Sequence, residues 1–175
     1  MKIRILPDPD CEKPFLNFQV CYLFRSRYQL GNEAVTPERM KEIEQGIASG
    51  EIVGLPVKAY VHGCTYMTAD PITASRWPYD CPWDAGQSGF VYLPKGMVKK
   101  ALSVSRLTAK QLRRAHEMMI AEVKLLSQWL SGDCYGYKIE DEEGNELDSC
   151  WGFIGRDFVE ESAKEALEAL KEKSA

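Results

Sequence analysis

The sequence predicts an α+β fold, in which an antiparallel β-sheet carries amphipathic helices and residues 1–175 form a single domain. Three observations favour this class. Short alternating segments are grouped as hairpins, helical patterns lie between them, and the two do not alternate in the strict β-α-β order of a parallel sheet. The chain has 175 residues, 45% of them hydrophobic and 27% charged. That length is enough to bury roughly 70% of the unfolded surface.

Two strands and a helix are predicted in the first fifty residues. Residues 1–6 and 17–23 alternate between apolar and polar side chains, which is typical of half-buried strands. Thr36-Pro37-Glu38 is typical of a helix start, because Thr is a good N-cap and Pro suits the first helical position. We expect this helix to end at Ser49-Gly50.

The middle of the chain is predicted to hold a strand, a long loop and a second strand. Residues 52–61 are apolar and predict a strand. Residues 63–88 are rich in Pro, Asp, Trp and Cys and predict an irregular loop, and loops of this length are often functional. A short strand at 89–93 and a brief helix at 94–102 follow.

The longest helix is predicted to begin at Thr108-Ala-Lys-Gln111, which has the pattern of a capping box, and to end at Gly132. A final amphipathic helix is expected from about Asp157 to Glu172. The apolar residues of the longest helix recur every three or four positions and predict one buried stripe: Leu112, Ala115, Met119, Val123, Leu126 and Leu130.

Between these helices, residues 134–140 and 145–153 predict a β-hairpin. Asp141-Glu142-Glu143-Gly144 suits a type I turn followed by Gly144 in the left-handed conformation. A three-residue loop, Glu142 to Gly144, predicts three cross-strand pairs that share one face: Ile139–Leu147, Tyr137–Ser149 and Tyr135–Trp151.

Composition excludes several classes of protein. No apolar run approaches the roughly 18 residues of a membrane span, and the N-terminus lacks the apolar stretch of a signal peptide, so a cytoplasmic location is expected. The six cysteines are expected to be reduced, because a cytosolic chain keeps such thiols reduced. They form no Cys-x-x-Cys, and the nearest pattern to a metal-ligand pair is His62-Gly-Cys64 with Cys81 further on, so we expect thiols without a metal site, and no cofactor. The net charge of −4 argues against non-specific binding of nucleic acid by the whole surface.

The charges are unevenly placed along the chain. Residues 95–114 carry seven bases and no acid, whereas residues 133–175 carry thirteen acids and five bases. The acidic segment is either a set of solvated faces or a docking surface that imitates nucleic-acid phosphate for a basic partner. Direct nucleic-acid binding through the basic segment is the least favoured hypothesis, because Leu112 and Ala115 divide its bases on a helix.

Standard catalytic signatures are absent from the sequence. Of the two histidines, His116 lies at the edge of a buried helical stripe and is expected to be structural. His62 ends a strand and could activate a cysteine, for which the candidates are Cys64, Cys81 and Cys150. A small hydrolase or transferase using these residues is the alternative hypothesis to a binding protein.

The loop offers the densest group of aromatic and acidic residues. Large aromatic side chains on a Gly- and Pro-shaped loop suit a recognition surface, although the same loop could be a lid with its two tryptophans buried. We expect acids of the hairpin to add long-range attraction to a basic partner. The predicted binding residues are Trp77, Asp80, Trp83, Asp84, Gln87, Glu142, Glu143 and Glu146.

Three stretches carry a resemblance to a known family: Arg27-Tyr-Gln-Leu-Gly31, Cys81-Pro-Trp-Asp-Ala-Gly-Gln-Ser-Gly-Phe-Val-Tyr92, and Gly132 to Phe153 with its Asp-Ser-Cys-Trp-Gly-Phe ending. From about residue 20 to residue 165 the chain resembles a functionally uncharacterised family of small proteins from phages, prophages and plasmids of gut bacteria. The resemblance implies a mobile-element origin, and small acidic proteins of such elements often counter host defence, including CRISPR nucleases. It implies no catalytic residues.

The expected function is therefore that of a non-enzymatic inhibitor. Its expected partner is a host protein, such as a nuclease or a ribonucleoprotein defence complex.

Overall fold

The computed structural model describes residues 1–24, 28–78, 81 and 83–173, and it confirms the α+β class. Every strand pairing described is antiparallel. Among the helices of this described part, none combines the length and the apolar character that a membrane span needs. The elements in chain order are β1 (Lys2–Pro7), β2 (Gln19–Phe24), β3 (Tyr28–Gly31), α1 (Pro37–Ser49), β4 (Ile52–His62), β5 (Cys64–Thr68), α2 (Pro71–Ser75), β6 (Ala85–Pro94), α3 (Lys95–Ala101), α4 (Ala109–Leu130), β7 (Cys134–Glu140), β8 (Glu146–Ile154) and α5 (Arg156–Lys173).

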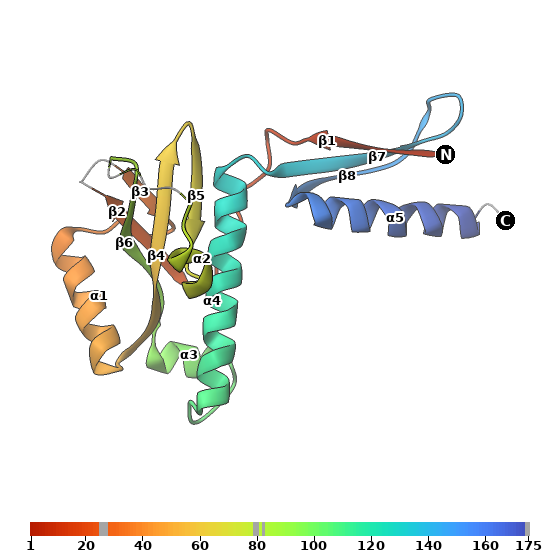
Figure 1. Ribbon diagram of the computed structural model, residues 1–175. Helices are drawn as coiled ribbons and strands as arrows, with labels where there is room; N and C mark the ends of the chain where they lie inside the picture. The colour runs from red at the N-terminus through yellow and green to blue at the C-terminus, as the bar shows by residue number, and fades with distance from the viewer. Residues whose placement is uncertain (25–27, 79–80, 82, 174–175) are drawn as a thin grey trace. The chain divides into compact units, whose positions relative to one another are not determined.

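The strands of the described residues form two sheets, whereas the sequence predicts one sheet (Figure 1). One sheet has the order β1-β7-β8 and the other the order β3-β2-β6-β4-β5. The chain divides accordingly into two compact units. The terminal unit comprises Met1–Pro14 and Gln128–Ala175, and the central unit comprises Phe15–Ser127. The single domain expected from the sequence stays a prediction.

In the central unit, α1 packs on one face of the five-stranded sheet (Figure 1). Thr36 caps the helix by accepting a hydrogen bond from Arg39 N at 3.3 Å, and Pro37 occupies its first turn. Gly50, with a φ of +75°, ends it in the left-handed conformation that favours glycine. Both predicted ends of this helix are confirmed. The buried residues between helix and sheet are Cys21, Val35, Ile43 and Tyr92.

The helix α4 lies on the other side of this sheet from α1 (Figure 1). Its predicted capping box is confirmed, because Thr108 N donates to Gln111 Oε1 at 2.7 Å and Gln111 N donates to Thr108 Oγ1 at 3.4 Å. Leu112 is 37% exposed, so the buried stripe begins at Ala115 and not at Leu112 as predicted. The fully buried members of that stripe are Ala115, Met119, Val123 and Leu126.

The stretch 63–88, predicted to be an irregular loop, contains regular structure. β5 folds back onto β4 through a tight turn at Gly63, whose φ of +68° favours glycine. α2 begins after Asp70, whose carboxylate accepts hydrogen bonds from the first turn, and β6 begins at Ala85. The prediction was wrong because β5 has only five residues and because Asp70-Pro71, a helix start, also has the composition of a loop.

In the terminal unit, α5 covers one face of the sheet β1-β7-β8 (Figure 1). Val159 and Ala163 of the helix are fully buried against Tyr137 and Ile139 of the central strand. The predicted helix from Asp157 to Glu172 is thus confirmed. Partly buried apolar residues of all three strands complete this core: Ile3, Ile5, Tyr135 and Phe153.

The predicted hairpin between β7 and β8 is present, but its register differs from the prediction beyond the turn. Asp141 N donates to Asn145 O at 3.0 Å and Gly144 has a φ of +88°, which confirms the three-residue loop. Two bulges in β8 then shift the pairing. Leu147 is the extra residue of the first bulge, and Gly152, with a φ of +86°, lies in the second. The observed pairs are Ile139–Asp148, Tyr137–Cys150 and Tyr135–Phe153.

Candidate functional site

The predicted binding residues of the loop fall in the central unit, close to the start of β6. Trp83 is 70% exposed, whereas Trp77 is half-buried, so the hypothesis of a lid that buries both tryptophans does not describe Trp83. Asp80 lies outside the described residues. Gln87 belongs to β6, where its backbone pairs with Lys58, and its side chain lies outside the described part.

Asp84 brings together two residues that the sequence analysis singled out. Its carboxylate oxygen Oδ2 lies 3.0 Å from His62 Nδ1 and accepts a hydrogen bond from Cys81 Sγ at 3.4 Å. The backbone fixes this position, because Val61 N donates to Asp84 O at 2.8 Å and Ala85 N donates to Cys81 O at 2.8 Å. His62 stands at the end of β4 with its side chain 71% exposed.

This arrangement differs from the one that nucleophilic catalysis by cysteine needs. A catalytic imidazole lies between the thiol, whose proton it accepts, and an orienting carboxylate. Here the carboxylate of Asp84 lies between Cys81 and His62. A second candidate, Cys64, donates from Sγ to the backbone oxygen of His62 at 3.7 Å. Both thiols therefore donate hydrogen bonds to oxygen atoms and not to the imidazole ring. The carboxylate of Asp84 is the group that joins His62 and Cys81.

The predicted acids of the hairpin belong to the terminal unit. Glu142 and Glu143 are exposed at the turn, which Asp141 shapes by accepting hydrogen bonds from Asn145. These bonds lower the pKa of the Asp141 carboxyl group. Glu146 Oε2 lies 2.6 Å from Lys138 Nζ, and this contact is the main cause that lowers the pKa of Glu146. The side chains of Glu142 and Glu143 are thus exposed at the turn, whereas Glu146 pairs with a lysine of the neighbouring strand.

The outer side of α5 carries a larger set of acids, which the sequence analysis counted but did not place on one surface. We call this set the α5 acidic face. Its side chains line a shallow groove of about 500 Å³, and most of them are exposed. The members are Asp157, Glu160, Glu161, Glu165 and Glu168, with Lys164 among them.

The division into units concentrates the charge. The terminal unit has sixteen acids and eight bases, a net charge of −8, whereas the central unit has ten acids and fourteen bases, a net charge of +4. The charge of the terminal unit is therefore larger than the −4 of the whole chain and opposite in sign to that of the central unit. A surface of this kind attracts basic partners and repels nucleic acid.

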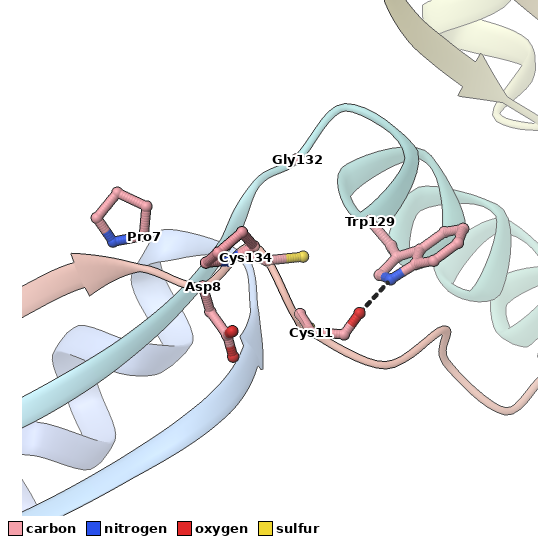
Figure 2. Close-up of a pocket in the computed structure, with 7 residues that line it drawn as sticks. Pro7, Asp8, Cys11, Trp129, Gly132 and Cys134 are labelled. Carbon is pink, nitrogen blue, oxygen red and sulfur yellow. Dashed lines mark hydrogen bonds between the residues drawn. The ribbon is translucent and has the colours of Figure 1, made fainter.

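A cavity of about 390 Å³ in the terminal unit holds two of the six cysteines, all of which are free thiols (Figure 2). Cys11 and Cys134 both line it, and Trp129 Nε1 donates to Cys11 O at 3.0 Å. Burial, and after it the hydrogen bond with the Cys11 thiol, raises the pKa of Cys134 to about 12. Cys134 is therefore protonated at neutral pH and is a poor nucleophile.

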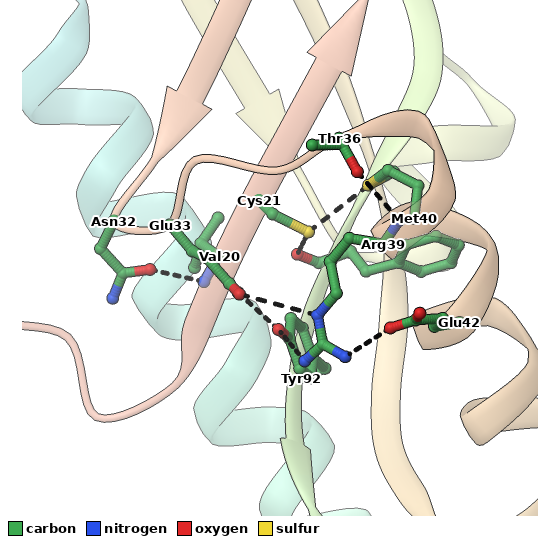
Figure 3. A network of polar contacts seen from close by, with 10 residues as sticks. Val20, Cys21, Asn32, Glu33, Thr36, Arg39, Met40, Glu42 and Tyr92 are labelled. Carbon is green, nitrogen blue, oxygen red and sulfur yellow. Dashed lines mark hydrogen bonds and ion pairs between the residues drawn. The ribbon is translucent and has the colours of Figure 1, made fainter.

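A polar network in the central unit, of which Tyr92 is the buried member, has a structural role (Figure 3). The Tyr92 hydroxyl, on β6, donates to Glu33 Oε2 and accepts from Arg39 at 3.4 Å, and Arg39 also pairs with Glu42 at 3.0 Å. Burial is the main cause that raises the pKa of Tyr92 to about 12. Because Arg39 belongs to α1 and the buried Tyr92 to β6, the network ties α1 to the sheet.

Comparisons of the chain with protein-family models, with characterised proteins and with solved structures found no match.

Proposed function

We propose that this protein is a non-enzymatic inhibitor from a phage or another mobile element, which acts in the cytoplasm of a bacterial host. It binds a basic surface of a host nuclease or ribonucleoprotein defence complex, and the α5 acidic face takes the place of nucleic-acid phosphate there. The observation that carries the proposal is the density of charge on α5. The sequence resemblance supports the mobile-element origin, and the host partner follows from that origin.

The charge density can be compared with that of nucleic acid. From Asp157 to Glu168 a helix rises about 17 Å, at 1.5 Å per residue. Five carboxylates and one ammonium group lie along this length, and Arg156, directly before it, pairs with Glu160 at 2.9 Å. With Arg156 included, three net negative charges lie along about 18 Å, which is one per about 6 Å, against roughly 3.4 Å for one strand of B-DNA. A basic groove that tracks one phosphate backbone therefore meets on α5 a line of negative charge of about half that density.

The enzyme hypothesis has less support. Because Asp84 lies between Cys81 and His62, neither of these residues is placed to activate the other. A binding protein needs no such activation. We expect His62→Ala and Cys81→Ala to bind the partner as the wild type does.

The test is affinity capture from a lysate of a gut-bacterial host at low salt. The bait is the full chain, either wild type or with Glu161→Gln and Glu165→Gln on α5. The matched control carries Glu38→Gln and Glu44→Gln, which remove the same charge from two exposed positions of α1 in the central unit. We expect the wild type and the control to retain the same nucleic-acid-handling protein and the α5 variant to retain much less of it. Equal retention by all three baits would refute the role of the α5 acidic face.

A further inference from the structure

A cavity of about 490 Å³ in the central unit is not used by the proposed inhibitory surface. Residues of β5, α2 and α4 line it, together with Trp77 and Pro78 from the segment after α2. This volume lies within the range of roughly 300–1,000 Å³ that is typical of small-molecule sites. The sequence analysis placed Trp77 on a protein-binding surface, whereas the structure places it in the wall of this cavity.

The walls of the cavity are mainly apolar and aromatic. Tyr66 from β5 and Trp77 supply two aromatic rings, and Met67 and Ile120 supply apolar surface. A buried hydrogen bond joins two of the elements that line the cavity, because Met67 N of β5 donates to Ser127 Oγ of α4 at 2.8 Å. Rings of this kind bind the faces of flat aromatic molecules, because a planar ligand buries a large apolar area against them.

Two charged groups line the cavity, and they differ in how they are engaged. The carboxylate of Asp70 accepts hydrogen bonds from Ile72 N, Thr73 N and Thr73 Oγ1, so its oxygens are turned to the start of α2. Lys124 projects from α4, and in the part of the chain that the structure describes no hydrogen bond or ion pair engages its ammonium group. Lys124 is therefore the cation available to a ligand.

We infer that this cavity binds a flat aromatic molecule with a single carboxylate, whose ring lies against Trp77 and Tyr66 and whose carboxylate meets Lys124. One negative charge fits better than two, because Lys124 is the single cation among the described residues that line the cavity and Asp70 repels additional negative charge. A fused bicyclic ring has a size that the cavity can hold. The inference concerns the central unit and does not rest on the proposed function of the terminal unit.

The test uses four probes with the full-length protein and measures binding by titration with NMR and calorimetry. Indole-3-acetate combines ring and carboxylate, indole has the ring alone, acetate has the charge alone, and AMP is an aromatic phosphate dianion. We expect indole-3-acetate to bind most tightly, with a dissociation constant on the order of 0.1 mM for a ligand of this size.

Two substitutions on the same helix separate charge from structure. Lys124→Gln is expected to weaken indole-3-acetate roughly two- to fivefold, as loss of an exposed ion pair does, and to leave indole unchanged. Lys110→Gln removes an exposed cation from α4 away from the cavity and is expected to change neither affinity. The resonances shifted by indole-3-acetate should be those of residues 66–78 and 120–127.

Several results would overturn the inference. Absence of binding by both indole and indole-3-acetate at millimolar concentration would show that the cavity is not a site. Tighter binding of AMP than of indole-3-acetate would make phosphate the preferred group. Equal weakening by Lys124→Gln and Lys110→Gln would show that the charge acts only at long range.

Discussion

Gly136 and Trp151 provide a test of the observed hairpin register. A Cβ atom added at Gly136 would lie 2.2 Å from Trp151 Cε3 and 2.4 Å from Trp151 Cδ2, so the indole ring covers this glycine. The register predicted from sequence places Trp151 opposite Tyr135, on the other face of the sheet. Gly136→Ala distinguishes the two arrangements, because only the observed one puts the new methyl group against the indole ring.

The expected cost follows from the contact that is lost. Trp151 is 45% exposed, so about half of its surface is buried. That half corresponds to roughly 100 Å² and about 2.5 kcal/mol at 25 cal/mol per Å². Displacement of the ring forfeits part of this, and the backbone oxygen of Cys150, 2.9 Å from the added Cβ, limits relaxation. We expect Gly136→Ala to lower the free energy of unfolding by about 1–2 kcal/mol.

Urea denaturation followed by circular dichroism measures the effect, and a double-mutant cycle assigns it. In the Trp151→Ala background, Gly136→Ala is expected to cost much less, because the ring is gone. If Trp151 lay on the other face, Gly136→Ala would stabilise the strand by about 0.5–1 kcal/mol, as alanine does relative to glycine. A stabilising single substitution, or no coupling in the cycle, would refute the observed register.

Three further predictions concern single side chains. Trp83→Ala is expected to leave the urea midpoint unchanged within error, because this side chain is mostly exposed. If the loop binds the captured partner, the same substitution is expected to speed its dissociation. A large loss of stability would assign Trp83 to the core. Burial lowers the pKa of His116, so the folded state favours its neutral form: stability is complete above pH 6.5 and falls as the pH drops through the lowered pKa. His116→Gln should flatten urea midpoints measured between pH 7 and 5, and an unchanged profile would contradict this. In the native protein at pH 8, exposed Cys150 should react with a thiol reagent before Cys21 and Cys134, whose pKa values burial raises to about 11 and about 12; equal rates would refute that order.

Local signals in the sequence were sufficient to predict α1, α3, α4 and α5, whereas α2 was missed. Thr108 and Gln111 satisfy each other's backbone donors within one turn, and no distant residue decides that contact. Gly50 ends α1 for the same kind of local reason. The turn at Gly144 was also predicted, because its conformation depends on adjacent residues.

The register of the hairpin could not be predicted from the same signals. Alternation of apolar and polar residues assumes that no residue is added to a strand, and each of the two bulges in β8 adds one. Gly152 is the only local trace of the second bulge, since its positive φ favours glycine. The length of the loop was therefore predicted correctly, whereas the predicted pairs between β7 and β8 beyond the loop were wrong.

The candidate site shows a similar limit. The sequence singled out His62, Cys81 and Asp84, and the structure brings the three together, but the order of the contacts depends on how β4 meets the start of β6. Lys124 and Tyr66 were missed as cavity residues, because on a helix and a short strand they carry no motif. The sequence analysis counted the acids of residues 133–175 but did not place those of α5 on one surface. They share a face of the helix because they are spaced three or four residues apart.

The central claim is that the α5 acidic face occupies a basic surface that otherwise holds nucleic acid. The most direct measurement is a competition between the protein and the nucleic-acid substrate of the captured partner, at several salt concentrations. We expect the protein and the nucleic acid to exclude each other from the partner. The affinity of the wild type is expected to fall roughly tenfold or more between 50 and 300 mM salt, and that of the variant with Glu161→Gln and Glu165→Gln less steeply. A ternary complex of protein, partner and nucleic acid, or identical salt dependence for both forms, would contradict this claim.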